Sequence, residues 1–300
     1  MSAPTGIPAA PANRTTLTTL KRSVHAVSRT TGRITSGGRI LPSFLITGAQ
    51  RSGTTSLYRT LASHPLVLKP VLHKGVHYFD VAYDRGLPWY RAHFPLRATA
   101  SRLARRYGRR PQAFESSPYY LFHPLAASRI AADLPGVKLV VLVRDPVERA
   151  FSAHAHELAR GFETEPDFAR AVELEEERLA GAQEALTASP HAVHHSHRHH
   201  AYLARGRYAE QLARLEALVG RDRILVLDSG EFFTRPRDVY DRVLDFLGLP
   251  QLGEAVFERH NARPRPAPMP SSLRRELSAR FEHSDALLAS WLGAEPSWRS

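Results

Sequence analysis

A glycine-rich loop near the start of the chain has the residue types and spacing of a phosphate-binding site. Residues 48–55 read GAQRSGTT, so two glycines are separated by four residues. A short apolar segment, 43–47, precedes the loop and a helix-forming segment, 54–62, follows it. Such a loop directs backbone N–H groups to one point at a helix N-terminus, where an oxyanion is favoured. Arg51 adds a forked cation.

One residue of this loop separates it from the loops of nucleoside triphosphatases. Those proteins carry a lysine that reaches the β- and γ-phosphates, and this chain has Thr54 at that position. Transfer of a γ-phosphoryl group would therefore lose its main cation. A glycine turn that binds no ligand is the structural alternative. Bare glycine loops are common, but a loop that also carries Arg51, Thr54 and Thr55 at a helix start is less so.

The most apolar stretch of the chain predicts a second binding position. A continuous Val/Leu run at 137–143 suits a central parallel strand that is covered on both faces. Arg144 follows immediately, before a helix over 147–158. Polar residues at the carboxyl end of such a strand lie where open α/β sheets bind ligands. Arg144 is therefore a candidate anion ligand, and a salt bridge to Asp145 or Glu148 is its structural alternative.

The periodicity of the rest of the chain predicts an α/β fold. Further extended segments are predicted at 75–80, 112–114 and 223–228, and helices at 124–133, 163–184, 207–219 and 236–247. A last amphipathic helix would bury Leu273, Leu277, Phe281, Leu287 and Leu288. We expect a single α/β domain over 41–300, with a central parallel sheet of four or five strands flanked by helices.

Positive charge is concentrated in two segments. The net charge is +12, from 41 Lys and Arg against 29 Asp and Glu. Residues 1–40 hold basic but no acidic residues in a Thr/Ser/Pro/Gly-rich setting, which predicts a disordered basic tail. The second cluster also lacks acids and comprises Arg97, Arg102, Arg105, Arg106, Arg109 and Arg110. It could hold nucleic acid, anionic lipid or an acidic substrate, or it could be a solvated arginine-rich helix.

Composition excludes several kinds of chemistry. The chain has no cysteine, which excludes disulfides, thiolate metal sites and cysteine nucleophiles. No run approaches the roughly 18 apolar residues of a membrane span, and the N-terminus lacks a secretory signal. We therefore expect a soluble, cytoplasmic protein, with peripheral membrane contact still open. The strip 190–200 holds six histidines, and His195 and His199 could face one Zn²⁺, but no acidic third ligand lies there.

Taken together, the motifs resemble those of the sulfotransferases that use 3′-phosphoadenosine 5′-phosphosulfate (PAPS), in particular bacterial relatives of the heparan sulfate enzymes. The likeness runs from about Phe44 to Leu249. Residues 50–55 match the 5′-phosphosulfate loop of that family, which implies PAPS contacts from Arg51, Ser52, Gly53, Thr54 and Thr55. Residues 143–152 match its 3′-phosphate motif, which implies that Arg144 and Ser152 bind the second phosphate.

The resemblance also implies where the catalytic base lies. Residues 74–80 are similar to the family's Lys-Glu-x-His-Phe-Phe-Asp segment, but Gly75 stands where the family has its usual catalytic glutamate. We therefore expect His77 to act as general base, because its ordinary pKa of about 6.5 suits the task, with Glu115 in reserve. Arg51 replaces the loop lysine of the heparan-type enzymes and would neutralise the leaving phosphate oxygen.

Two other segments depart from the family pattern. The family closes a basic loop on the 3′-phosphate, for which Arg263 and Asn261 are the candidates, although the cysteine pair of that loop is absent. In the family a lysine often follows the glutamate that corresponds to Glu115, and this chain has Ser116 there. Acceptor contacts of that lysine therefore do not carry over to this chain.

The resulting hypothesis is sulfuryl transfer from PAPS to a hydroxyl or amine, with no metal required. The acceptor could be a glycan, a lipid-linked sugar or a small molecule, held in a pocket of Trp89, Tyr90 and Tyr119. The alternative for the aromatic cluster at 89–94 is that it belongs to the hydrophobic core, and that is the default interpretation. A kinase-like phosphotransferase and a basic nucleotide- or nucleic-acid-binding protein are the alternatives. The first requires ATP with Mg²⁺, and the second requires steeply salt-dependent binding.

Overall fold

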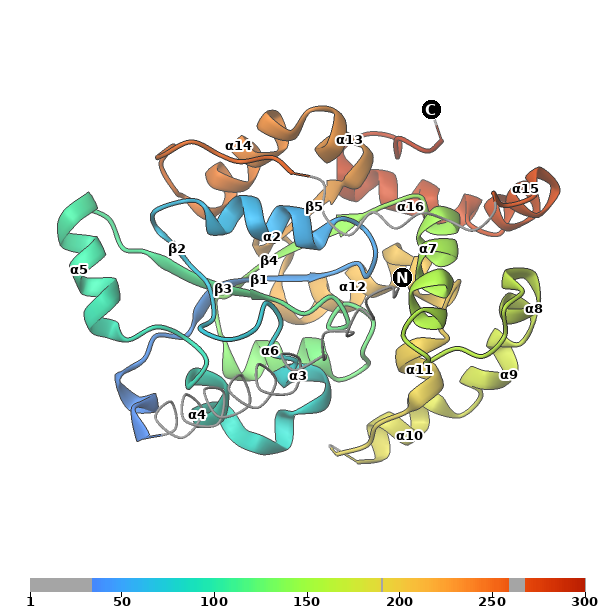
Figure 1. The fold of residues 1–300 in the computed structure, drawn as a ribbon, viewed down its shortest axis with the longest axis horizontal. Coiled ribbons are helices and arrows are strands. Elements are labelled where there is room, and N and C mark those ends of the chain that lie inside the picture. Colours follow the sequence, from blue (N-terminus) through green and yellow to red (C-terminus); the bar gives the residue numbers. More distant parts are fainter. Residues whose placement is uncertain (1–33, 190, 259–267, 300) are drawn as a thin grey trace, which may run out of the picture.

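One parallel sheet organises the part of the chain that the computed structural model describes, residues 34–189, 191–258 and 268–299. Its five strands are arranged in the order β2-β3-β1-β4-β5, and all neighbouring pairs are parallel. The α/β fold expected from the sequence is therefore confirmed (Figure 1). The strands are β1 Pro42–Gly48, β2 Val67–Leu68, β3 Gln112–Ser116, β4 Lys138–Val143 and β5 Ile224–Asp228.

Helices cover both faces of the sheet (Figure 1). On one face, β1 and β4 pack against α2 Thr54–Ala62, α13 Ser229–Thr234 and α14 Pro236–Leu247. On the other face lie α3 Tyr78–Val81, α4 Gly86–Arg91, α6 Ala126–Asp133, α12 Tyr208–Val219 and α16 Glu282–Leu292. The other α-helices of the described residues are α5 Arg97–Tyr107, α7 Pro146–Leu158, α8 Phe168–Glu173, α9 Glu175–Leu179, α10 Ala182–Ala188, α11 His195–His199 and α15 Ser271–Ala279.

The apolar run of β4 occupies the centre of this arrangement. Leu139, Val141 and Val143 belong to the core on one face, and Val140 and Leu142 belong to the core on the other. All five side chains are fully buried. Because successive residues of a strand point to opposite faces, a strand covered on both sides has to be apolar throughout. This explains why the run predicted a central strand correctly.

The connections that follow β1 and β4 lead to opposite sides of the sheet. From β1 the chain passes through α2 to β2 and β3 on one side, whereas β4 leads to β5 on the other side. The loops that leave β1 and β4 therefore diverge, and open α/β sheets bind ligands in the crevice that this leaves at the carboxyl ends of the strands. Residues 48–55 and Arg144 both emerge at this point.

Three predicted elements differ in the structure. The segment 75–80 is not an extended strand, because helix α3 begins at Tyr78 after His77 adopts a left-handed φ of 56°. The long acidic helix at 163–184 is divided into α8, α9 and α10, the last of which starts after Gly181 at φ 67°.

The predicted C-terminal helix is two helices, α15 and α16. The chain turns at Phe281, and this turn buries Leu277, Phe281 and Leu288 but leaves Leu287 half exposed. A single straight helix would have placed all of them along one stripe.

The aromatic cluster at 89–94 belongs to the hydrophobic core, which was the default interpretation of the sequence. Tyr90 and Phe94 are fully buried, and Tyr78 stacks on Tyr90 with ring centroids 4.7 Å apart. The predicted tail of 1–40 is described only from residue 34, where Ser36–Gly38 form a 3₁₀ helix and Arg39 pairs with Leu96 in an isolated bridge.

Candidate active site

A cavity of about 950 Å³ lies at the carboxyl ends of β1, β4 and β5. The loop after β1, the residues after β4, the start of α13 and a segment near the C-terminus each contribute part of its wall. The lining includes Gln50, Arg51, Gly53, Thr54, Thr55, Lys74, Pro118, Arg144, Ser152, His156, Phe233, Phe257, Glu258, Ser297 and Trp298. Six of the residues predicted to bind the cofactor therefore line one cavity.

The glycine loop has the backbone geometry of an anion-binding turn. Arg51 and Gly53 both adopt left-handed φ values, 69° and 90°, and α2 begins directly afterwards at Thr54. A non-glycine residue in this region is uncommon and costs of order 1 kcal/mol, so it is typical of functional sites. At Gly53 a Cβ would lie 3.0 Å from the ring of Phe233, so the position has little room for a side chain. The loop is thus held tightly at the helix N-terminus.

The two predicted anchor points are in direct contact. Arg51 Nε donates to Ser152 Oγ at 3.1 Å, and Arg144 Nη1 donates to the backbone carbonyl of Arg51 at 3.3 Å. The guanidinium of Arg144 therefore points at the glycine loop, and the two motifs form one basic surface. Arg144 Nη2 also lies 3.4 Å from Glu148 Oε2, so the salt bridge considered as its structural alternative is present as well.

The segment that follows β4 is positioned by capping. Asp145 Oδ1 accepts from the N–H groups of Val147 and Glu148 at 2.9 and 3.2 Å, and Pro146 occupies the first turn of α7. An aspartate at the N-cap followed by proline is a strong helix start signal. Tyr208 on α12 donates to the carbonyl of Arg144 at 2.8 Å. Arg144 therefore leaves the strand on a fixed backbone.

Lys74 supplies a cation that the sequence prediction did not assign to the site. Its Nζ lies 2.9 Å from Thr55 Oγ1 and 3.3 Å from Thr54 Oγ1, and it lines the cavity. Burial lowers the pKa of Lys74 to about 8, although the charge of Glu115 opposes this. The only sequence signal was its place in the segment 74–80, which resembles a family motif.

Gly75 lies where the structure leaves no room for the family's glutamate. A Cβ at this position would be 2.6 Å from the carbonyl oxygen of Ser116 and 3.0 Å from Ser117 Oγ. The close approach exists because the N–H of Ser116 donates to the carbonyl of Lys74 at 3.0 Å. The strip that begins at Lys74 is therefore fastened to the carboxyl end of β3.

His77 is paired with an aspartate. Its Nδ1 lies 2.7 Å from Asp80 Oδ2, and 37% of its side chain is exposed. Burial lowers the pKa of His77, but the charge of Asp80 and this hydrogen bond raise it, and the net pKa lies above the ordinary value. Its backbone N–H donates to Ser117 Oγ at 3.0 Å, next to Pro118 in the cavity wall. His77 itself is not part of the cavity lining.

Glu115 is completely buried behind this strip, and its carboxylate is fully engaged. Oε1 accepts from the hydroxyls of Tyr120 and Tyr90 at 2.7 and 3.3 Å. Oε2 accepts from Ser117 Oγ at 2.7 Å and from the N–H of Val76 at 3.2 Å. Burial raises the pKa of Glu115, and these hydrogen bonds oppose the rise. A carboxylate with four donors and no exposed surface is suited to positioning the strip rather than to taking a proton from an acceptor.

Three further predictions have different outcomes. Ser52 is fully buried, and its N–H donates to the carbonyl of Ala49 at 3.2 Å, so it stabilises the turn of the loop. Arg263 and Asn261 lie outside the described residues. The suggested acceptor pocket of Trp89, Tyr90 and Tyr119 is not formed at this cavity, because none of them lines it.

The histidine strip contacts the glycine loop through a polar chain. His199 Nδ1 lies 2.9 Å from Glu157 Oε2, and Gln50 Nε2 donates to Glu157 Oε1 at 3.2 Å. Arg205 donates to Gln50 Oε1 from the other side. Within residues 34–189, 191–258 and 268–299, no group of three His, Asp or Glu side chains is arranged to hold a metal ion. The strip therefore supports Gln50 in the wall of the cavity.

Comparison with known proteins places these observations in a family. The sulfotransferase domain family matches residues 41–263, and the chain therefore belongs to the sulfotransferase family. A crystal structure of a sulfotransferase from Alicyclobacillus acidocaldarius is 29% identical and superposes with a TM-score of 0.62. That match covers 87% of this chain and 100% of the other.

Curated relatives include two kinds of heparan sulfate enzyme. The human bifunctional heparan sulfate N-deacetylase/N-sulfotransferase 3 is 28% identical over 215 residues, 70% of this chain and 22% of that protein. Mouse heparan sulfate glucosamine 3-O-sulfotransferase 6 is 37% identical over 124 residues, 41% of this chain and 33% of that protein. The match thus spans about a fifth of the first protein's length and a third of the second's. Among its described residues, no helix has the length and apolar character needed to cross a membrane.

Proposed function

We propose that this sulfotransferase moves a sulfuryl group from PAPS to a hydroxyl or amine of its acceptor. The observation that supports this best is the junction of the two anchor motifs in one cavity. Arg51 contacts Ser152, and Arg144 contacts the loop of Arg51. A nucleotide with phosphates at both its 3′ and 5′ positions needs two anion sites about one ribose apart, and adjacent strand ends supply them.

The residues of the cavity fit such a ligand. Arg51, Lys74 and Arg144 bring three cations to its wall, and the loop before α2 adds N–H groups at a helix N-terminus. Phe233, Phe257 and Trp298 add aromatic surface on which a purine could stack. The volume of about 950 Å³ is within the range of nucleotide-sized pockets.

We assign the charge neutralisation at the 5′ end to Lys74 and Arg51 together. When bound, PAPS supplies an activated sulfuryl group on its 5′-phosphate. Lys74 reaches Thr54 and Thr55 and so lies where the lysine of a triphosphatase loop would place its charge. Fixed cations and loop N–H groups at this point would stabilise the negative charge that develops on the departing phosphate. Arg144 and Ser152 would hold the 3′-phosphate.

His77 remains our candidate for the general base, and Glu115 becomes a positioning residue. Asp80 accepts from Nδ1 of His77, which leaves Nε2 as the ring nitrogen that could take the acceptor's proton. Glu115 holds Val76 and Ser117, and Ser117 in turn accepts from the backbone of His77. The geometry of the base thus depends on a buried carboxylate that need not change its protonation state.

The names of the relatives suggest a class of acceptor, which we propose for this chain. The relatives act on heparan sulfate by their names, so a glycan hydroxyl or amine is the first class to test. The cytoplasmic location expected from the sequence is a separate prediction, which fractionation of the source cells would test.

Calorimetric titration with adenosine 3′,5′-bisphosphate, and separately with ATP and Mg²⁺, tests the donor assignment. We expect tighter binding of the bisphosphate, and Arg144→Ala should weaken it at least ~10-fold because a phosphate loses a charge-assisted donor. Arg170→Ala is the matched control, since Arg170 is exposed on α8 and pairs with Glu173 outside the cavity. Preference for ATP with Mg²⁺, or equal effects of the two substitutions, would contradict the proposal.

A further inference from the structure

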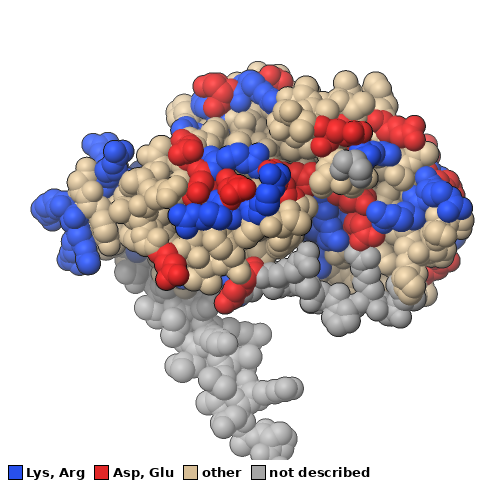
Figure 2. Space-filling view, turned by 90° about the horizontal axis from the view of Figure 1, so that it is seen from above, with Lys and Arg blue, Asp and Glu red and all other residues tan. Residues whose placement is uncertain are grey.

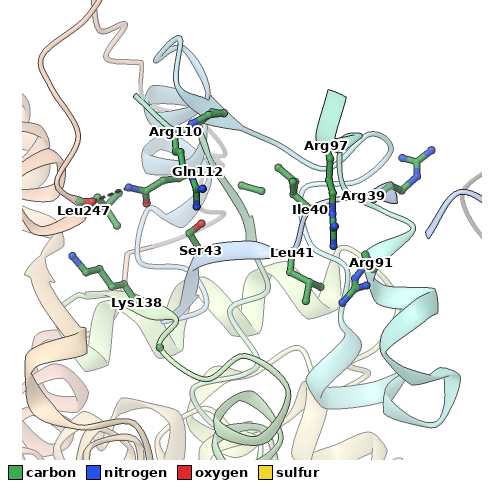
Figure 3. A pocket seen from close by; sticks show the side chains of 13 residues that line it. Arg39, Ile40, Leu41, Ser43, Arg91, Arg97, Arg110, Gln112, Lys138 and Leu247 are labelled. Carbon is green, nitrogen blue, oxygen red and sulfur yellow. Dashed lines mark hydrogen bonds between the residues drawn. The ribbon is translucent and has the colours of Figure 1, made fainter. Parts of the chain in front are cut away.

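A second cavity lies at the opposite end of the sheet from the candidate active site. Its volume is about 590 Å³, and it is bounded by residues at the amino ends of β1, β3 and β4. Figure 3 shows Lys138 and Arg110 on one side of it and Arg97, Arg91 and Arg39 on the other, with Ser43, Ile40 and Leu41 between them. Since β1 is seven residues long, at ~3.3 Å per residue the two cavities are roughly 20 Å apart.

The charge of this cavity is entirely positive among the described residues that line it. Five of them are cations, and none is acidic. Within the described part of the chain these five form no ion pair, and the partners of Arg39 and Lys138 are neutral oxygens: Thr35 Oγ1 and the carbonyl of Phe94 for Arg39, and the carbonyl of Phe246 for Lys138.

One guanidinium has unused hydrogen-bonding capacity. Arg91 Nε is buried and makes no hydrogen bond within residues 34–189, 191–258 and 268–299. A buried polar group without a partner is costly, and several like charges around one hollow repel each other. A bound anion would relieve both effects.

Helix α5 borders the same cavity at both of its ends. Arg97 is its first residue, and Arg110 lies three residues after its last residue, Tyr107. No residue of α5 is buried, and the segment 97–110 contains six arginines and no acid. In Figure 2 basic side chains stand at the left end of the molecule, where α5 projects in Figure 1. This concentration of charge lies beside the cavity and would draw anions towards it.

We propose that this cavity is a second anion-binding site, which takes a small organic molecule with two or more phosphate or sulfate groups. Several groups are required because five cationic residues line one cavity. Ile40, Leu41 and Ala113 give the cavity an apolar part, which suits a ligand with a carbon framework. The described residues that line it include no aromatic side chain for base stacking, and the cavity is concave, so neither single-stranded nucleic acid nor a flat membrane surface fits it as well.

The test uses the double variant Arg51→Ala/Arg144→Ala as parent, so that anion binding at the candidate active site is suppressed. Inorganic pyrophosphate and a disulfated disaccharide are titrated separately by calorimetry, which distinguishes phosphate from sulfate ligands. We expect saturable binding of at least one probe to this parent. Adding Arg97→Ala/Arg110→Ala should weaken that binding at least ~10-fold, because two of the five lining cations are lost.

The matched control adds Arg102→Ala/Arg105→Ala to the same parent. These two arginines lie on α5 but do not line the cavity, so the net charge falls equally while the cavity keeps its cations. We expect less than a ~3-fold change in affinity for this control. If both pairs of substitutions weakened probe binding equally, general surface charge would explain the effect and the proposal would be overturned. Absence of saturable binding to the parent would overturn it as well. Neither result bears on the donor assignment, which is tested separately with the bisphosphate.

Discussion

Replacing Lys74 by methionine should make the ligand-free protein more stable and the cofactor site weaker. Burial lowers the pKa of Lys74 from 10.5 to about 8. A drop of that size corresponds to about 3 kcal/mol of unfavourable free energy for holding the charge in the folded protein. The hydrogen bonds to Thr54 and Thr55 return about 1 kcal/mol each. Methionine keeps the length of the side chain without the charge, so we expect the free energy of unfolding to rise by about 1 kcal/mol.

The pH dependence of stability gives this prediction a second readout. Below pH 8 Lys74 is protonated in both the folded and the unfolded protein, and the penalty is fully present. Between pH 8 and 10.5 the unfolded chain binds more protons than the folded one, so stability gains from this residue as the pH rises. Lys74→Met should lose this contribution. Urea unfolding at pH 7 and at pH 10, without ligand, measures both effects.

Ligand binding should respond in the opposite direction. A phosphate beside the glycine loop would favour the charged form of Lys74 and raise its pKa again. We therefore expect Lys74→Met to weaken adenosine 3′,5′-bisphosphate binding ~10-fold or more, and the unmodified protein to take up a proton on binding at pH 8.5. Calorimetry in two buffers of different ionisation enthalpy measures that uptake. Lys69→Met is the control, since Lys69 is exposed and does not line the cavity. A Lys74→Met protein that is less stable but binds the bisphosphate normally would refute the reasoning.

Two further predictions concern the strip that follows Lys74. Gly75→Glu should lower the free energy of unfolding by about 1–3 kcal/mol without raising turnover, because its Cβ would lie 2.6 Å from the Ser116 carbonyl oxygen. Urea unfolding checks this against Gly37→Glu, where the Cβ meets nothing within 4 Å, and a stable, faster Gly75→Glu enzyme would contradict it. His77→Ala should lose at least ~10²-fold in turnover at unchanged bisphosphate affinity. Because Asp80 raises the pKa of His77, Asp80→Asn should move the acidic limb of kcat/KM to lower pH, and an unmoved limb would exclude His77 as the base.

The parts of the fold that could be predicted are those that local patterns determine. The Val/Leu run of β4 predicted a central strand, and the helix predicted over 236–247 does end at Leu247, where Gly248 closes α14 at φ 69°. The strip at 75–80 was predicted wrongly because its structure depends on distant residues. Tyr120 accepts the N–H of Tyr78 and Ser117 accepts that of His77, some 40 residues away. Sequence periodicity contains no such information.

The same distinction applies to the site. That Arg51 and Arg144 would line one cavity could be predicted, because each follows a strand at a recognisable motif and parallel strands bring their carboxyl ends together. Lys74 follows no strand directly, and its place in the segment 74–80 did not indicate that it reaches Thr54 and Thr55, about 20 residues earlier in the chain. Glu115 was predicted as a reserve base, and its four hydrogen-bond donors, which the sequence does not reveal, indicate a positioning role instead.

The position of Lys74 explains how the loop can lack its own lysine. In a triphosphatase loop the lysine lies on the same segment as the N–H groups, and here Thr54 takes its place while the charge arrives from the strip fastened to β3. That strip also carries His77, three residues later. One backbone segment, held to the carboxyl end of β3 by the Ser116–Lys74 backbone hydrogen bond and by Glu115, therefore positions both the cation that we propose for the leaving group and the candidate base. A disturbance of Glu115 should consequently affect donor binding and proton transfer together, whereas a change at Arg144 should affect donor binding alone.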